Sequence, residues 1–338
     1  MQVDSEFGFE LRVCQWAERH WPPREGGRPT VIARQLGTGR RRWDTVVLEC
    51  DPEGLAARAA FGERALDSDL LHVVGHAPAE WAYYRDALPD PGYPWRYVRE
   101  AVHRAAGRGA IESRKRGGRI EIRRIAPYPD WVERVVAIEN KPDLDRSAAR
   151  DLADQLHRDV ALGLADEVWV ATAATGERVE PILLEDLPAE AGILTLADDG
   201  TVEVSWHPRT LAVAEPGTRV LENPDAGPSA ARFEYADPDW KAAKRREIAE
   251  RAYERGWRSY ADTMRPDCRH FELRPDGEWV LPRCVAKGRV PTASECRGSC
   301  PEFEPEPPAW RSQGWPIEGG PGAAIKRLLA ERRARRRP

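Results

Sequence analysis

The sequence predicts an α/β fold in which helices flank a mixed β-sheet. Outside one long interruption, the apolar patterns give a helix, a β-hairpin, a strand, a helix and a further strand, in that order. A hairpin is antiparallel, whereas a strand, a helix and a second strand in succession form a parallel crossover, so the sheet must contain both strand directions. At 338 residues the chain is long enough for about two domains.

The first helix is expected over residues 7–20. Phe7, Leu11 and Cys14 recur there at the spacing that places them on one helical face. Pro22 ends the pattern, because proline lacks the backbone N–H that a helix requires.

A β-hairpin is expected next. Its strands are the β-rich runs 30–36 and 45–50, which the turn-prone sequence GTGRRR separates. Asp44 stands at the start of the second strand.

The third strand is expected over residues 132–141, after an interruption of about eighty residues. Asp145 is a plausible N-cap for the helix that follows, in which Ala149 and Leu156 share an apolar face. Short apolar runs predict the remaining strands, at residues 166–172, 193–196 and 201–206.

The interruption, residues 51–130, has its own pattern. Residues 79–88 and 95–109 are expected to be helical, and residues 110–125 to form a hairpin around Gly117-Gly118. Two helices, the second of them basic, followed by a hairpin are typical of a winged helix-turn-helix. Residues 96–124 contain ten Arg or Lys against three Glu, a local charge of +7 in a chain whose net charge is −4.

A winged helix of this charge is expected to bind duplex DNA. Its second helix would face the major groove and its hairpin turn would form the wing. The alternative is a protein-interaction module whose arginines are only solvated, and the local charge favours DNA. The expected contacts are Arg96, Arg99 and His103 on the helix and Arg114, Lys115, Arg116 and Arg119 on the wing.

The remainder divides by composition. Residues 207–240 are rich in Pro, Ala and Asp and are expected to be largely linker, and residues 241–264 form a charged helix. The expected units are a core (1–50 plus 131–222), an inserted winged helix (51–130), a linker with the charged helix (223–262), a cysteine-rich module (263–305) and a basic tail (306–338).

Glu139-Asn140-Lys141 ends an apolar strand. Side chains two apart in a strand project from the same face, so Glu139 and Lys141 project together, and Pro142 then turns the chain out of the sheet. With Asp44 as a second carboxylate, Glu139 can bind Mg²⁺ or Mn²⁺, and the ammonium can position water and offset charge on a phosphate. Glu10 on the first helix is expected to reach this site.

Each of these residues also has a structural interpretation. Exposed strands often pair Glu with Lys only for solubility, and Asp44 is suited to cap a turn. Glu49 is the competing carboxylate on the same strand. His72 and His76 are four positions apart, but their apolar neighbours favour local packing or hydrogen bonding over metal binding.

Residues 7–50 and 131–205 resemble the PD-(D/E)XK nuclease superfamily, which includes restriction endonucleases and RecB-like exonucleases. The resemblance implies that Asp44 and Glu139 bind a divalent metal ion and that Lys141 is catalytic. It matches Glu10 to the acid of the family's first helix and Gln155 to a glutamine that RecB-like members place near the substrate.

The chain departs from that family in two respects. No proline precedes Asp44, and 95 positions separate Asp44 from Glu139 where many members have about 10 to 30, which an inserted winged helix would explain. The whole chain also resembles an uncharacterised family of archaeal, especially haloarchaeal, proteins, and this supplies no activity.

Four cysteines fall within one short stretch: Cys268, Cys284, Cys296 and Cys300. Four thiolates suffice for tetrahedral Zn²⁺, with His270 as a spare ligand. The runner-up is a 4Fe–4S cluster, because some RecB-like nucleases carry one. Those place one cysteine before the nuclease motifs, as Cys14 or Cys50 would be, so the grouping of all four after the core favours zinc.

No apolar run is long enough for a membrane span, and the N-terminus lacks the order of a signal peptide, so we expect a cytoplasmic protein with no membrane partner. The sequence leaves its oligomeric state open. Two functions remain: a Mg²⁺- or Mn²⁺-dependent DNA nuclease that acts in repair, recombination or defence, or a non-catalytic DNA-binding or regulatory protein that retains the nuclease fold.

Overall fold

The fold was analysed in a computed structural model of the chain. The structure describes residues 6–23, 28–39, 41–174, 185–221, 232–260, 264–276, 279–292, 294–296 and 299–305. The expected basic tail, residues 306–338, lies outside them.

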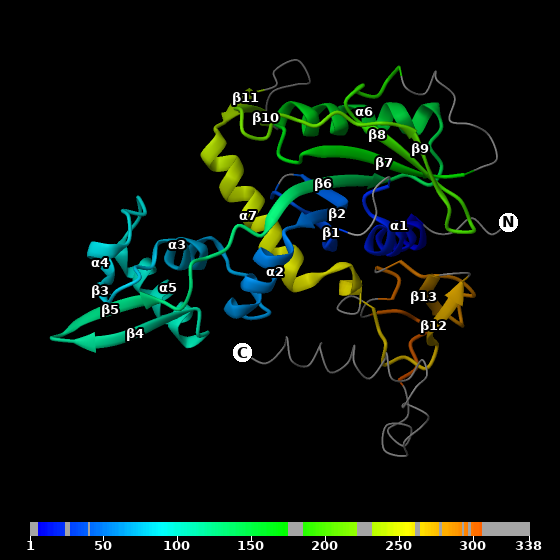
Figure 1. Ribbon diagram of the computed structural model, residues 1–338. Coiled ribbons are helices and arrows are strands. Elements are labelled where there is room, and N and C mark those ends of the chain that lie inside the picture. Colours follow the sequence, from blue (N-terminus) through cyan, green and yellow to red (C-terminus); the bar gives the residue numbers. More distant parts are fainter. Residues whose placement is uncertain are drawn as a thin grey trace.

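A six-stranded mixed sheet forms the centre of the molecule, with the strand order β1-β2-β6-β7-β8-β9 (Figure 1). β6 pairs antiparallel with β2 and parallel with β7, and β8 is parallel to β7 and antiparallel to β9. The expected mixed sheet is therefore confirmed. Its strands are β1 (Thr30–Gly37), β2 (Arg42–Cys50), β6 (Val132–Asn140), β7 (Glu167–Ala173), β8 (Gly192–Leu196) and β9 (Val202–Trp206).

Helices cover both faces of this sheet. α1 (Glu6–His20) packs on one face with Val47, Val136 and Ile138. On the other face, α6 (Arg146–Leu162) and α7 (Pro238–Arg255) pack over the intervening residues of the same strands. The alternation of side chains along each strand thus gives two separate cores, one on each face. The expected N-cap is confirmed, because the Asp145 carboxylate accepts a hydrogen bond from the Ala148 N–H.

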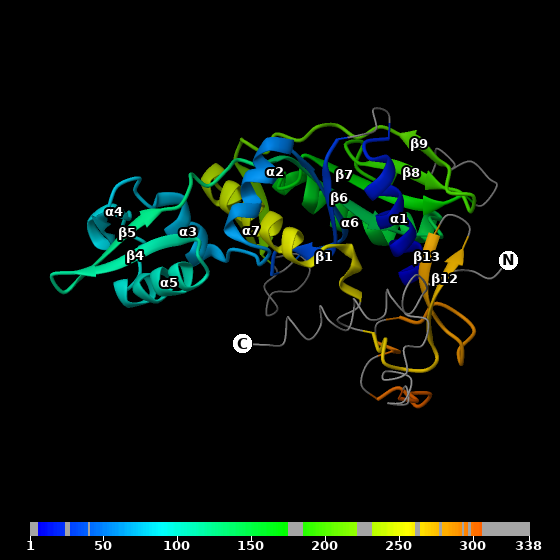
Figure 2. The same cartoon turned by 60° about the horizontal axis from the view of Figure 1, so that its bottom comes forward.

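The long interruption is a small α/β unit with a core of its own, placed to one side of the sheet (Figure 2). Its three strands have the order β3-β5-β4. Gly117 and Gly118 join β4 to β5 with φ angles of +55° and +79°, which few other residues adopt. The elements are α2 (Pro52–Arg58), a 3₁₀ turn η1 (Ala59–Phe61), α3 (Ser68–His76), β3 (Ala82–Tyr83), α4 (Tyr84–Ala87), α5 (Trp95–Gly107), β4 (Ile111–Arg116) and β5 (Arg119–Arg124).

The helix expected over 79–88 is wrong for most of its length. Ala82 and Tyr83 pair instead with β5, and only the four residues of α4 are helical there. The first long helix of the unit is α3, which was not among the helices expected from the sequence. Asp67 caps it, and Leu70, Val73 and Val74 are its buried residues.

The described parts of residues 207–240 contain regular secondary structure, contrary to the expected linker. β10 (Gly217–Leu221) and β11 (Arg232–Ala236) form an antiparallel pair within them. α7 begins at Pro238, capped by Asp237, and ends before Gly256, where the chain continues into the 3₁₀ turn η3 (Trp257–Ser259).

A buried ion pair joins the inserted unit to the core. Arg58 donates to both carboxylate oxygens of Glu250 on α7, at 2.6 and 2.5 Å, and both side chains are fully buried. Tyr128 Oη and the backbone N–H of Leu66 donate to the same carboxylate at 2.6 and 2.7 Å. The Ala65 N–H also donates to the exposed Glu254 carboxylate at 3.3 Å, so Glu250 is the buried acceptor of the junction and Glu254 an exposed one.

The cysteine-rich segment contains a hairpin of β12 (Phe271–Asp276) and β13 (Trp279–Cys284), which lies against α1 (Figures 1 and 2). Among the helices that the structure describes, none is both long and apolar enough to cross a membrane.

Candidate functional site

Asp44 and Glu139 lie on adjacent antiparallel strands. Thr45 of β2 is the register partner of Ile138 of β6, so continuing the register by one residue sets Asp44 opposite Glu139. Opposite side chains in an antiparallel pair have Cβ atoms about 5 Å apart. Asp44 Oδ2 also accepts from the backbone N–H of Asn140 at 3.0 Å. Strand pairing therefore brings together two acids that lie 95 positions apart in the sequence.

Glu10 of α1 reaches the same site through Gln35. The amide nitrogen of Gln35 lies 3.2 Å from Glu10 Oε1 and 3.0 Å from Asp44 Oδ1. Arg34 donates to the same oxygen of Glu10 at 2.8 Å. Gln35 has a φ of +53°, the only positive φ among the non-glycine residues that the structure describes. Strain of this kind is concentrated at functional sites, and here it lies at the residue that joins two of the acids.

Arg41 occupies the other side of the site. Its Nη2 atom lies 2.7 Å from Glu139 Oε1 and 2.8 Å from Asp159 Oδ2, and Asp159 comes from α6. The carboxylates thus already hold one cation, the guanidinium of Arg41. A divalent ion that bound Glu139 Oε1 would compete with this guanidinium, whereas an ion on the second oxygen, Oε2, could share the carboxylate with Arg41.

Burial and the neighbouring acids favour the protonated form of Glu139. Its side chain is 7 % exposed. Burial and then the charge of Asp44 raise its pKa to about 8, although Arg41 acts in the opposite direction. Because the pKa in the folded state lies above the ordinary value of 4.5, the contribution of this group to stability declines as the pH rises from about 4.5 to about 8. A bound cation would stabilise the ionised carboxylate of Glu139 and so offset this loss of stability.

The pKa of Glu10 is also raised, by burial first and by Asp44 in addition. Asp44 therefore acts on both of the other acids, so the three carboxylates form one electrostatic unit.

Lys141 follows β6 directly, and its backbone N–H donates to Ala171 O at 2.8 Å, which continues the pairing of β6 with β7. Its side chain is 31 % exposed, and its Nζ atom lies 3.9 Å from Glu6 Oε1. Gln155 is exposed on α6. The buried acid that α6 contributes to the site is Asp159, one helical turn further along.

Other expected residues have local roles. Glu49 accepts from Trp21 Nε1 at 2.9 Å near the opposite end of β2. His76 Nδ1 lies 2.8 Å from His72 O, in agreement with the local hydrogen bonding that was expected for these two histidines in place of metal binding. Cys14 and Cys50 are buried in the two sheet cores, where burial raises the pKa of each thiol to about 12.

No three His, Cys, Asp or Glu side chains of the described residues are already arranged to hold a metal ion. The acids of this site nevertheless supply the oxygen donors that Mg²⁺ and Mn²⁺ prefer. Metal binding would therefore require the side chains of these acids to move.

The seven residues expected to contact DNA fall into two groups. Arg114 is paired with Glu121 at 2.7 Å. Six others are exposed, and none of them has a carboxylate partner among the described residues: Arg96, Arg99 and His103 on α5, and Lys115, Arg116 and Arg119 at the turn between β4 and β5.

Three residues of the site were missed in the sequence: Gln35, Arg41 and Asp159. The signal for Asp159 was present, because it lies three positions after Leu156 on the apolar face of its helix. Gln35 and Arg41 carry no such signal, since their roles depend on the shape of the β1–β2 hairpin.

A protein-family model described as a family of unknown function, DUF5787, matches residues 31–305. The match covers the sheet, the insertion and the four clustered cysteines. No curated protein and no solved structure matches the chain.

Proposed function

The chain belongs to this family of unknown function, DUF5787, and from the geometry of its own residues we propose that it is a Mg²⁺- or Mn²⁺-dependent DNA nuclease. The observation that carries the proposal is the register that sets Asp44 opposite Glu139 at one end of the sheet. Glu10 is joined to Asp44 through Gln35, and Lys141 follows the strand of Glu139.

The proposed reaction is hydrolysis of a phosphodiester bond. A water oxygen bonds to phosphorus, the bond from phosphorus to one ester oxygen breaks, and that oxygen takes up a proton. Asp44 and Glu139 would hold the divalent ion, which when bound lowers the pKa of water and offsets charge on the phosphate. The ammonium of Lys141 would orient the attacking water and stabilise the negative charge that develops.

We further propose that the core is of the PD-(D/E)XK type and that the insertion is a winged helix. The PD-(D/E)XK assignment is supported by a helix that carries Glu10, a hairpin that carries Asp44 and a parallel β6–α6–β7 crossover. The winged-helix assignment is supported by the four helices of the insertion, of which α3 and α5 are the longest, and by a strand and a terminal hairpin in a sheet of order β3-β5-β4. In a winged helix, α5 would enter the major groove and the β4–β5 turn would contact phosphates.

The wing provides a test of DNA binding. Replacing Lys115 and Arg116 by alanine is expected to weaken binding of a DNA duplex and to lower the slope of log K against log salt by about 2, since each lost phosphate contact removes about 0.9. Fluorescence anisotropy at several salt concentrations measures both quantities. Arg209→Ala with Arg246→Ala removes the same charge from exposed positions outside the insertion and is expected to leave the slope unchanged. Equal slopes for the two double variants would exclude the wing as a DNA contact.

The second candidate is a non-catalytic DNA-binding protein with the same fold. The ion pair of Arg41 with Glu139 favours it, because a site that keeps its own cation needs no metal ion. Incubation of linear, nicked and branched DNA with Mg²⁺ or Mn²⁺ separates the candidates. We expect metal-dependent cleavage of at least one form, and DNA binding without cleavage of any form would favour the second candidate.

A further inference from the structure

Four cysteines line one small pocket at one end of the β12–β13 hairpin, and their side chains would have to turn toward its centre to hold an ion. Cys284 is the register partner of Phe271, and Cys268 lies three residues before Phe271, so the hairpin brings these two cysteines together. After the hairpin the chain comes back to the first cysteine, as shown by the β-bridge that pairs Cys268 with Pro305. Cys296 and Cys300 lie within this return and line the same small pocket as the first two.

The surroundings of the pocket suit thiolates. Arg265 and Lys287 also line it, and the backbone N–H of Arg265 lies 3.3 Å from Cys296 Sγ. Cationic side chains and N–H donors stabilise the negative charge of sulfur. A cation bound at the centre of four thiolates would offset the repulsion between them.

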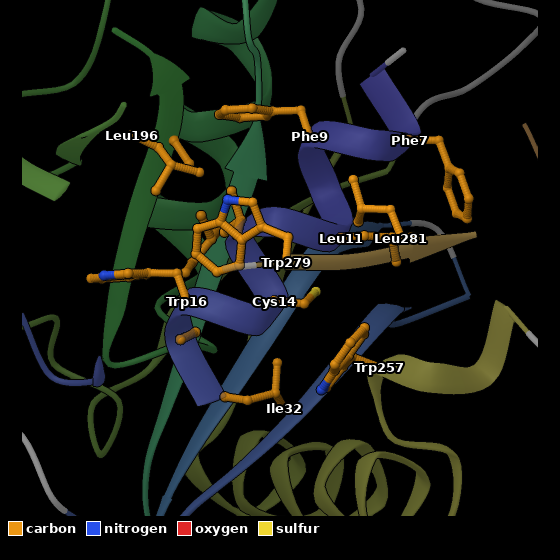
Figure 3. Packing of buried hydrophobic residues seen from close by; sticks show 14 of the residues in the cluster. Phe7, Phe9, Leu11, Cys14, Trp16, Ile32, Leu196, Trp257, Trp279 and Leu281 are labelled. Carbon is orange, nitrogen blue, oxygen red and sulfur yellow. The ribbon is translucent and has the colours of Figure 1, made fainter. Parts of the chain in front are cut away.

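The opposite end of the hairpin is fixed to α1. Trp279 and Leu281 pack into the same core as Leu11 and Trp16, and their side chains converge in Figure 3. The backbone N–H of Val280 donates to Gln15 Oε1 at 3.0 Å. The hairpin therefore holds α1 against the sheet, and α1 is the helix that carries Glu10.

We propose that Cys268, Cys284, Cys296 and Cys300 bind one Zn²⁺ ion and that this ion stabilises the hairpin that holds α1. Four Zn–S bonds form, the thiol protons pass to solvent, and the −2 charge of the complex faces Lys287 and Arg265, whose guanidinium also pairs with Asp267 at 2.9 Å. Small segments of this kind commonly need a metal ion to fold. The consequence for Glu10 rests on the proposed function, whereas zinc binding and its effect on α1 do not.

Metal content tests the first part. Protein purified without added metal is expected to contain one zinc per chain by elemental analysis, and native mass spectrometry of the wild type gives the same answer without any substitution. Cys296→Ser and Cys300→Ser are expected to lose the zinc, whereas Cys14→Ala and Cys50→Ala retain it. Iron with sulfide, two disulfide bonds, or four thiols without metal would each overturn the proposal.

Hydrogen exchange tests the second part. Removal of zinc from the wild type with a chelator is expected to increase amide exchange at least tenfold in β12, β13 and α1, while β6 and β7 keep their protection. Unchanged exchange in α1 would overturn the role of the ion in holding that helix. Neither measurement depends on nuclease activity, so this proposal and the proposed function can fail separately.

Discussion

Asp44→Asn is expected to lower the rate of metal-dependent DNA cleavage by about 10³-fold or more, because it removes one of two carboxylate ligands while keeping the shape of the side chain. The amide can still accept the hydrogen bond from the Asn140 N–H, so the fold is retained. Glu139→Gln is expected to have an effect of the same size. Lys141→Ala is expected to lower the rate by about 10²- to 10³-fold.

Glu203→Gln is the matched control for these variants, since Glu203 is an exposed acid on β9 of the same sheet. It is expected to cleave at the wild-type rate. Equal cleavage by Asp44→Asn, Lys141→Ala and the wild type would assign the activity to a contaminant or to a different site.

Glu250→Gln is expected to lower the free energy of unfolding by about 3–5 kcal/mol, because it leaves the buried guanidinium of Arg58 without its charge partner. Tyr128 and Leu66 donate to the same carboxylate, so the loss extends over the whole junction. Urea unfolding measures the change.

Glu254→Gln, one helical turn further along α7, serves as the control, because the exposed Glu254 carboxylate accepts from the Ala65 N–H at 3.3 Å and the amide oxygen of glutamine can still accept that bond. It is expected to change the free energy of unfolding by no more than about 0.5 kcal/mol. Equal stability of the two variants would show that the insertion is anchored to the core by other contacts.

The parts of the fold that the sequence predicted correctly are those with strong periodicity. The strand that ends at Asn140 and the helix capped by Asp145 were expected within a residue or two of their observed bounds. β3 and the β10–β11 pair were missed because short strands are stabilised by their partners and not by a pattern of their own. The aromatic run at 81–84 was expected to be helical, yet Ala82 and Tyr83 pair with β5, in line with the preference of aromatic residues for strands.

The candidate site could be predicted only in part. Glu139 follows from strand alternation, and Asp44 follows once β2 is paired with β6. Gln35 joins Glu10 to Asp44 from a backbone with a φ of +53°, and sequence periodicity carries no information about a single backbone angle. Arg41 reaches across to two acids from different elements, which depends on the tertiary structure alone.

Binding of Mn²⁺ tests the central claim most directly. The titration should be performed above pH 8, where Glu139 is ionised, with calorimetry on the wild type, Asp44→Asn, Glu139→Gln and the Glu203→Gln control. The wild type and Glu203→Gln are expected to bind Mn²⁺ with the same affinity, and the other two are expected to bind at least tenfold more weakly. Equal binding by all four proteins, or no binding by the wild type, would contradict a metal site at Asp44 and Glu139.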